Sequence, residues 1–176
     1  MRVISRLISV LVIAIAGVTL FACKESISEQ QASLEENIVE TDTVRDRLEI
    51  LSLLNRHQIY LDLYGATGIA SVYSNDALYD SPLATAHGAK ELITLFELQR
   101  KSGTMAGKRH FIGPAMVDID GDQAMAISYW WVAKTVAPQT VNATGTYRDK
   151  LRRIDGQWKI VHRVQTLDSD GRTAMK

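Results

Sequence analysis

The sequence predicts an α+β domain in which N-terminal helices pack on one face of a curved antiparallel sheet. Helical periodicity of the apolar residues is confined to the stretch from Val44 to Lys101. After Lys108 the chain consists almost entirely of extended segments rich in β-branched and aromatic residues, and Asp-Gly turns separate them. Helices followed by a long run of strands give this fold class, and 176 residues suffice for one domain of ordinary size.

The first 22 residues have the pattern of a secretory signal peptide. Arg2 and Arg6 are the only charges before Lys24, and the run from Leu7 to Ala22 is almost unbroken apolar sequence. This run is shorter than the roughly 20 residues that a membrane-spanning helix needs, and it fits the apolar core of a signal peptide. An N-terminal anchor helix that is never cleaved is the alternative interpretation.

The end of this segment indicates which kind of signal it is. Leu20-Phe21-Ala22-Cys23 resembles the bacterial lipobox, in which the cysteine receives lipid and becomes the mature N-terminus. Cys23 is the one cysteine of the chain, so it has no disulfide partner. The resemblance implies a lipoprotein anchored in the bacterial cell envelope by acyl chains such as palmitate on Cys23. Lys24 in the next position favours the periplasmic face of the outer membrane, in a cell that has one.

Residues 24–42 are polar, mostly acidic and free of Gly and Pro, which predicts a tether between Cys23 and the domain. The domain is expected at 43–170, with a short tail at 171–176. Without Arg2 and Arg6 the mature chain has a formal charge of 18 − 20 = −2. A nearly neutral chain gives no reason to expect nucleic acid as a partner.

Three helices are expected before the sheet. The first spans 44–64 and ends at the glycines of 65–68, a short second one spans 69–73, and a third spans 88–101. The first helix carries two adjacent strips, Val44, Leu48, Leu51, Asn55, Ile59 and Asp62 in one, and Ile50, Leu54, His57, Leu61 and Tyr64 in the other.

A brief strand is expected at 77–80, and five longer candidates follow the third helix. Asp118–Asp122 and Ile154–Gln157 contain Asp-Gly and predict hairpin turns between them. The five candidates are Arg109–Ile112, Ala115–Ile119, Gln123–Val136, Thr140–Ile154 and Gln157–Leu167.

Asp62 and His110 are the residues that best fit a chemical role. Asp62 is in phase with an apolar strip of the first helix, so its carboxylate points inward, where burial without a partner costs several kcal/mol. His110 stands near the start of the first long strand and could provide that partner. A His–Asp dyad would suit proton abstraction next to a carbonyl, hydroxyl or halide. A structural hydrogen bond is the alternative for both residues.

The strand at 140–154 supplies further candidates. Tyr147, Asp149, Leu151 and Arg153 alternate onto one face, which we expect to line a cavity, whereas Arg148, Lys150 and Arg152 face solvent or a subunit contact. Asp149 either pairs with Arg153 or binds a ligand. Tyr147 could act as an acid or as a hydrogen-bond donor.

Aromatic residues and histidines complete the inventory. One of Trp130 and Trp131 is expected to line the cavity with Tyr79, and packing of these aromatic residues as core filler is the favoured alternative. Trp158 and His57 are expected in the core, and the sequence identifies no partner for His87 or His162. The spacing of the four histidines does not predict a metal site, and no nucleophile elbow, phosphate loop or dinucleotide fingerprint is present. No cofactor is therefore expected.

Four segments, in order, resemble the landmarks of SnoaL-like domains of the nuclear transport factor 2-like superfamily. They are Asp62 to Asp80, Arg109-His110-Phe111-Ile112-Gly113, Gly145-Thr146-Tyr147-Arg148-Asp149, and Arg153 to Ile160. The resemblance runs from about Val44 to Asp168 and implies a cone-shaped fold, shared with scytalone dehydratase, polyketide cyclases and hexachlorocyclohexane dehydrochlorinase. In the enzymes of this group an aspartate on the first helix pairs with a histidine on the sheet, which corresponds to Asp62 and His110.

The sequence departs from scytalone dehydratase at several positions. The second catalytic histidine of that enzyme would fall near Val136, its pocket tyrosines near Leu61 and Ser81, and its pocket asparagine near Tyr147. The dehydration that scytalone dehydratase catalyses is therefore not expected here. His110 is a candidate general base, and the sequence identifies no general acid to act with it.

Two functions follow from these observations. The first is a cofactor-free lyase or isomerase that acts on a small apolar, aromatic or steroid-like molecule. The second is a non-catalytic ligand-binding or protein-interaction domain tethered to the membrane. A homodimer through the outer sheet face is expected in either case, because both faces of the strand at 123–136 are apolar.

Overall fold

The computed structural model describes the backbone of residues 2–168 and the side chains of residues 28–37 and 43–168. The chain divides into two compact units, Met1–Arg45 and Asp46–Lys176. The first unit consists of helix, which is the beginning of α1 (Arg2–Leu63). The helix thus begins far upstream of Val44, the residue at which the sequence predicted its start. The predicted signal peptide, the lipidation of Cys23 and the tail at 171–176 lie outside the described side chains.

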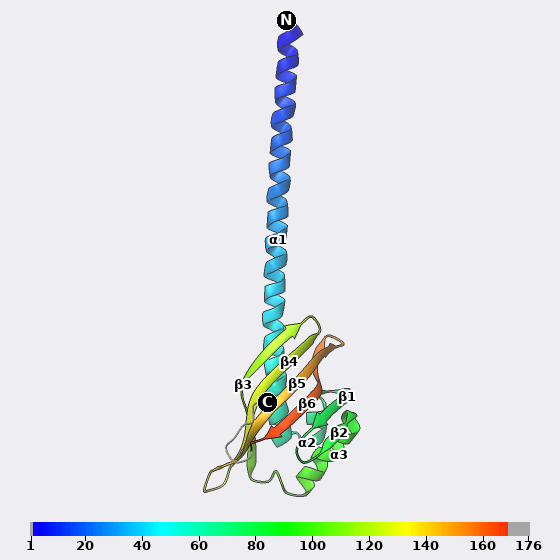
Figure 1. The fold of residues 1–176 in the computed structure, drawn as a ribbon, viewed down its shortest axis with the longest axis vertical. Coiled ribbons are helices and arrows are strands. Elements are labelled where there is room, and N and C mark those ends of the chain that lie inside the picture. The colour runs from blue at the N-terminus through cyan, green and yellow to red at the C-terminus, as the bar shows by residue number, and fades with distance from the viewer. Residues whose placement is uncertain (1, 169–176) are drawn as a thin grey trace. The chain divides into compact units, whose positions relative to one another are not determined.

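The second unit is built on a curved, mixed sheet of six strands (Figure 1). Their order is β2-β1-β6-β5-β4-β3, and all neighbours are antiparallel except β1 and β6, which are parallel. The expectation of a wholly antiparallel sheet is therefore wrong for this one pair. The strands are β1 (Tyr73–Asp80), β2 (Thr85–His87), β3 (Lys108–Asp120), β4 (Gln123–Lys134), β5 (Val141–Ile154) and β6 (Gln157–Leu167).

The helices of this unit cover one face of the sheet and form the core with it. They are the end of α1, α2 (Gly65–Ala70) and α3 (Gly88–Lys101). On α1 the buried face is the strip that contains Ile50, Leu54 and Leu61, whereas Val44 and Leu48 of the other predicted strip are exposed. The core joins side chains from the helices to those on the inner face of the sheet, namely Ile50, Leu53, Leu54, Leu61, Ile69, Leu92, Phe96, Val117, Ala124, Ala126, Leu151, Trp158 and Ile160.

The predicted element boundaries differ from the observed ones where long-range pairing decides the outcome. The two strands expected at 109–112 and 115–119 are a single strand, β3, whose register shifts between Ile112 and Ala115. The shift contains Pro114, which has no N–H to donate to a ladder. The second helix begins and ends earlier than 69–73, and β1 starts at Tyr73 because that residue pairs with Ile160.

Both predicted Asp-Gly turns are confirmed. In the β5–β6 hairpin Ile154 pairs with Gln157, and the two residues between them, Asp155 and Gly156, have φ angles of 50° and 74°. Positive φ at both positions is typical of the two-residue turns that match the twist of a hairpin. In the β3–β4 turn Gly121 likewise has a positive φ, 55°. These two turns fix the register at the turn ends of the β3–β4 pair and of the β5–β6 pair.

Within the described part of the chain, no helix combines the length and the apolar character needed to cross a membrane.

Candidate active site

Asp62 and His110 form a pair held by two hydrogen bonds. Asp62 lies in the last turn of α1, and His110 is the third residue of β3. The Asp62 Oδ1 atom is 2.7 Å from His110 Nδ1, and the backbone N–H of His110 donates to Asp62 Oδ2 at 3.0 Å. The two side chains are 6% and 14% exposed, so solvent competes little for these bonds. The carboxylate is thereby fixed at both oxygens, which holds the imidazole in one orientation.

This geometry sets the roles of the two ring nitrogens of His110. A carboxylate only accepts hydrogen bonds, so the neutral imidazole carries its proton on Nδ1 and donates it to Asp62. Within residues 43–168, Nε2 has no hydrogen-bond partner. Its lone pair is therefore available to accept a proton from a ligand. The catalytic role of the pair stays a prediction.

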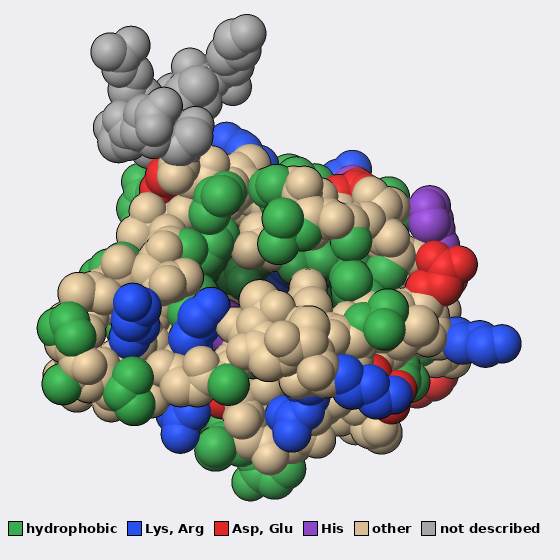
Figure 2. Space-filling model, turned by 90° about the horizontal axis from the view of Figure 1, so that it is seen from below, with side chains coloured by type: hydrophobic (Ala, Val, Ile, Leu, Met, Phe, Trp, Pro, Cys, Tyr) green, Lys and Arg blue, Asp and Glu red, His purple; other side chains and the backbone are tan. Residues whose placement is uncertain are grey.

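A pocket of about 280 Å³ opens beside this pair. It lies between α1 and the start of β3, and a second pocket of about 310 Å³ shares Asp62 and Arg109 with it. In the face of the molecule shown in Figure 2, hydrophobic side chains border a hollow. The first pocket suits one ring system rather than an extended ligand. Its lining residues are Asn55, Gln58, Ile59, Asp62, Leu63, Arg109, His110, Phe111 and Ile112.

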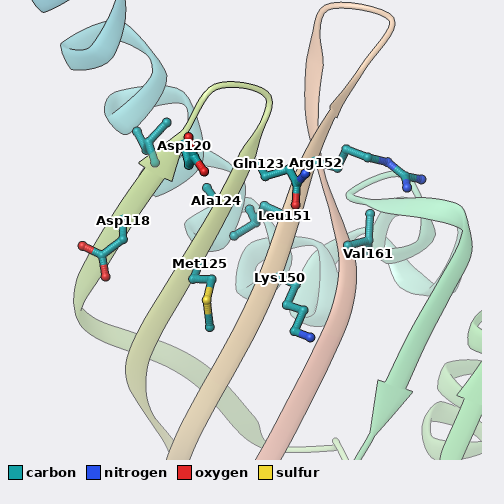
Figure 3. A pocket seen from close by; sticks show the side chains of 10 residues that line it. Asp118, Asp120, Gln123, Ala124, Met125, Lys150, Leu151, Arg152 and Val161 are labelled. Atoms are coloured by element: carbon teal, nitrogen blue, oxygen red, sulfur yellow. The ribbon is translucent and has the colours of Figure 1, made fainter.

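A larger groove, of about 520 Å³, lies on the other face of the sheet, which the helices do not cover. Figure 3 shows Asp118 and Asp120 on β3 along one side and Lys150 and Arg152 on β5 along the other, with Met125 of β4 between them. The predicted outward direction of Lys150 and Arg152 is confirmed by their exposure. This groove contains no member of the His–Asp pair.

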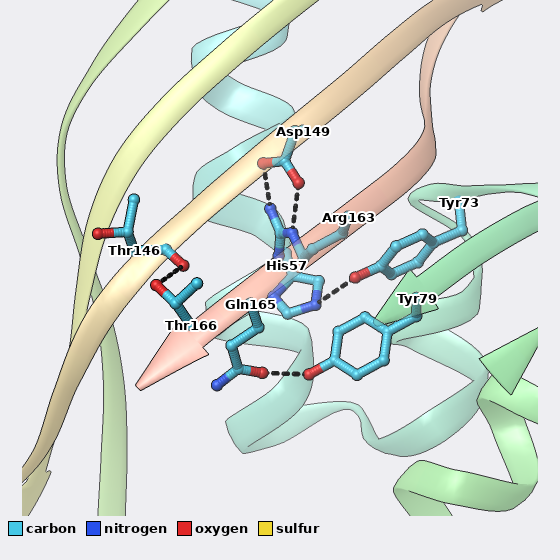
Figure 4. A network of polar contacts seen from close by, with 8 residues as sticks. All are labelled: His57, Tyr73, Tyr79, Thr146, Asp149, Arg163, Gln165 and Thr166. Atoms are coloured by element: carbon cyan, nitrogen blue, oxygen red, sulfur yellow. Dashed lines mark hydrogen bonds and ion pairs between the residues drawn. The ribbon is translucent and has the colours of Figure 1, made fainter. Parts of the chain in front are cut away.

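The predicted pairing of Asp149 with Arg153 is wrong, because Asp149 binds Arg163 of the neighbouring strand (Figure 4). The two guanidinium bonds measure 2.6 and 2.7 Å, and both side chains have no exposed surface. Asp149 and Arg163 are direct partners in the β5–β6 register, so the sheet itself brings them together. Arg153 binds Asp46 and Asp122 instead. With both oxygens of Asp149 engaged, its predicted role in ligand binding is not supported.

The adjacent tryptophans point to opposite faces of β4. Trp130 is buried on the inner face, stacks on Tyr147 with 5.7 Å between ring centroids, and donates to the Thr166 carbonyl at 3.2 Å. Trp131 stacks on Phe111. A Cβ atom at Gly145 would lie only 2.6 Å from the Trp130 indole and against the Thr166 carbonyl oxygen, so glycine is required there.

The remaining predicted residues belong to a network of polar contacts that is buried between the sheet and the helices (Figure 4). The Arg163 guanidinium lies 4.1 Å from the Tyr147 ring centroid, and burial raises the pKa of the Tyr147 phenol, so that its hydroxyl stays protonated. His57 is buried and 3.0 Å from the Tyr73 hydroxyl, and burial together with the Arg163 charge lowers its pKa, which keeps it neutral. The Tyr79 hydroxyl donates to Gln165 (Figure 4).

Asp62 and His110 line the pocket, whereas Tyr147, Asp149, Trp130 and Tyr79 do not. These four belong to the interior behind it. Among the described side chains, no group of three or more His, Cys, Asp or Glu residues could hold a metal ion.

The sequence interpretation missed Gln58 and the partner of His162. Gln58 lines the pocket one helical turn before Asp62, and this i, i+4 spacing was the available signal. His162 lies 2.9 Å from Asp80 on a neighbouring strand, and this hydrogen bond lowers the pKa of Asp80. No local sequence pattern indicates the contact between His162 and Asp80.

Solved structures of several bacterial proteins share this fold. An NTF2-like protein with a cystatin-like fold from Novosphingobium aromaticivorans has a TM-score of 0.70 and 29% identity, covering 77% of this chain and 90% of its own. A protein of unknown function from Nostoc punctiforme has a TM-score of 0.65 and 26% identity, over 71% and 92% of the two chains. A proposed scytalone dehydratase from Novosphingobium aromaticivorans has a TM-score of 0.61 and 20% identity, over 74% and 89%.

A comparison with curated proteins found no match. The family profile of the SnoaL-like domain, in contrast, matches residues 42–164, which is most of the chain and nearly all of the second unit. The match includes Asp62 and His110 as well as the inner faces of β4 and β5. This chain therefore belongs to the SnoaL-like domain family.

Proposed function

We propose that the domain is a cofactor-free lyase or isomerase in which His110 removes a proton from a carbon atom of a small apolar or aromatic molecule. The observation that carries this proposal is the pair itself. Asp62 holds His110 at two points and leaves Nε2 free beside a pocket with apolar walls.

The proposed step begins with transfer of the carbon-bound proton to His110 Nε2. The ring then becomes an imidazolium, which the Asp62 carboxylate stabilises at Nδ1. The electron pair of the broken C–H bond either moves onto a neighbouring carbonyl oxygen or expels a leaving group from the adjacent carbon. In an isomerase His110 returns the proton to another carbon, and in a lyase it gives the proton to the leaving group or to water.

The pocket and the relatives support this substrate class. Ile59, Leu63 and Ile112 give the pocket apolar walls that suit a hydrocarbon or aromatic ring. One of the similar structures is that of a proposed scytalone dehydratase. The fold alone does not decide the activity, because it is compatible with binding as well as with chemistry.

The test uses 5-nitrobenzisoxazole, whose N–O bond breaks and yields a coloured phenolate when a base removes its ring C3 proton. We expect the full chain, purified in detergent, to open this probe with saturation kinetics and faster than the same concentration of free imidazole. A rate no higher than that of imidazole would contradict the proposal. Binding of the probe without turnover would identify a ligand-binding domain.

We also propose that two copies of the domain associate through the outer face of the sheet. Apolar side chains are exposed there, and one of them, Met125 on β4, lies between the acidic Asp118 and Asp120 on β3 and the basic Lys150 and Arg152 on β5 (Figure 3). In a two-fold arrangement the acidic side of one protomer meets the basic side of its partner. The exposed apolar side chains are Phe111, Met116, Met125, Ile127 and Tyr129.

The double substitution Met125→Glu with Tyr129→Glu should convert the dimer to a monomer, because it places buried like charges across the interface. Light scattering coupled to size-exclusion chromatography measures the mass. Leu83→Glu is the matched control, since Leu83 is 83% exposed outside the sheet, and it should leave the dimer intact. A wild-type chain that elutes as a monomer would contradict the interface.

We propose, finally, that the chain is a lipoprotein of the bacterial cell envelope and is anchored through Cys23. Several acyl chains on one residue hold a protein firmly to a bilayer, whereas one chain binds only marginally. Cys23→Ser should therefore abolish labelling of the expressed chain by radioactive palmitate and move the protein from the membrane fraction to the soluble fraction. Persistence of Cys23→Ser in the membrane fraction would favour an uncleaved anchor helix.

A further inference from the structure

Gln58 is a buried residue of the pocket that no hydrogen bond explains. It lies on α1 one helical turn before Asp62, so both side chains leave the helix on the same face. It lines the 280 Å³ pocket together with His110, and only 3% of it is exposed.

Neither polar atom of the Gln58 amide has a hydrogen-bond partner. The side chain lies near His57 and Tyr147, and weak hydrogen bonding with it acts to raise the pKa of His57 and to lower that of Tyr147, but neither contact has the distance and angle of a full hydrogen bond. Burial of an amide with donor and acceptor both unsatisfied is costly, and an apolar side chain of the same size would avoid that cost. A glutamine at this position therefore indicates a partner that enters the pocket.

The other polar residues of the pocket are already engaged or lie at its surface. Asn55 Nδ2 donates to the Leu51 carbonyl at 2.8 Å, and Arg109 is exposed and donates to the Lys108 carbonyl. Asp62 and His110 bind each other. Gln58 is thus the buried neutral donor that remains for a ligand.

We infer that Gln58 is the residue that holds the oxygen of the bound ligand, with its Nε2–H donating to a carbonyl or phenolic oxygen. This inference rests on the proposed function in one respect: a negative charge develops on the ligand oxygen only if His110 removes a proton from the ligand. When Nε2 of His110 takes the proton, the electron pair moves onto that oxygen, and a preplaced N–H donor stabilises the new charge. Gln58 is therefore a specificity-determining residue that selects ligands with an oxygen over purely apolar or halogenated ones.

The test compares two probes of nearly the same shape, 4-nitrophenolate and 4-nitrotoluene, in which an anionic oxygen replaces a methyl group. The affinity of the full chain for each probe is measured by equilibrium dialysis in alkaline buffer, and the ratio of the two affinities reports the preference for oxygen. Wild-type protein should prefer 4-nitrophenolate. Gln58→Leu should lose about 10- to 100-fold of this preference, which is the effect of one hydrogen bond to a charged group.

Gln99→Leu is the matched control, because it makes the same change on α3, outside the lining of the pocket. It should keep the wild-type preference. The thermal midpoint Tm of Gln58→Leu should equal or exceed that of the wild type, since the substitution removes an amide without a partner. A lower Tm would indicate a structural role for Gln58 and would contradict the inference.

An unchanged preference in Gln58→Leu, or the absence of binding of either probe, overturns the inference. The measurement involves no turnover, so its outcome is separate from that of the proposed function. Protein that discriminates through Gln58 but does not open 5-nitrobenzisoxazole keeps this inference and loses the catalytic role. If the protein opens 5-nitrobenzisoxazole and Gln58→Leu keeps the wild-type preference, the catalytic role stands and the oxygen-binding role of Gln58 does not.

Discussion

His110→Ala should lower the rate at which the chain opens 5-nitrobenzisoxazole by on the order of 10²–10⁴-fold, which is the usual contribution of a positioned general base. The substitution removes the ring whose Nε2 is free beside the pocket, and it leaves the backbone bond from His110 to Asp62 Oδ2 in place. The loss should appear in kcat more than in KM, because the ring acts on the transition state. Initial rates over a range of probe concentrations measure both constants.

Two controls separate lost chemistry from lost structure in His110→Ala. Added imidazole should restore part of the rate, because it can enter the space that the ring vacates. Circular dichroism should show the wild-type content of helix and strand. A rate within a fewfold of the wild type would remove His110 from the mechanism, whatever the other variants do.

Asp149→Ala should lower the free energy of unfolding by about 3–5 kcal/mol, because it leaves the Arg163 charge buried without a counter-ion. The Arg163 side chain has no exposed surface, and its guanidinium makes two bonds to Asp149. In the wild type burial is the largest single effect and works against the charge, but the Asp149 carboxylate together with Tyr73 and Tyr147 raises the pKa of Arg163 overall. A guanidinium keeps its proton in proteins, so in the variant Arg163 does not escape the cost by becoming neutral. Urea unfolding followed by tryptophan fluorescence measures the change.

The double substitution of Asp149→Leu with Arg163→Met is the control for this prediction. Replacement of both members of a buried pair by apolar residues of similar volume is often close to neutral. The double variant should therefore be clearly more stable than Asp149→Ala. Equal stability of the two variants would show that the volume of the side chains, rather than the unpaired charge, accounts for the loss.

The sequence predicted the parts of this fold that depend on local patterns. The bounds of α3 and β6 and both Asp-Gly turns follow from periodicity and turn chemistry over a few residues. The parallel pairing of β1 with β6 and the three-residue strand β2 could not be predicted, because each depends on a partner distant in sequence or on a segment too short to carry a period.

The candidate site was predictable to a similar extent. Asp62 and His110 are 48 residues apart, yet the helical phase of Asp62 and the family resemblance both indicated the pair. The Asp149–Arg163 pair depends on sheet register, which alternation along one strand does not reveal. Gln58 forms no motif, and only its burial without a hydrogen-bond partner distinguishes it.

A double-mutant cycle on Asp62 and His110 tests most directly whether the two residues act as one unit. It compares kcat/KM for 5-nitrobenzisoxazole in the wild type, Asp62→Asn, His110→Ala and the double variant. Asp62→Asn alone should lower the rate by about 100-fold, because the amide neither fixes the tautomer nor stabilises the imidazolium. In the His110→Ala background the same substitution should change nothing, since Asp62 acts only through the ring. A further loss in that background, equal to the loss in the wild type, would contradict the dyad.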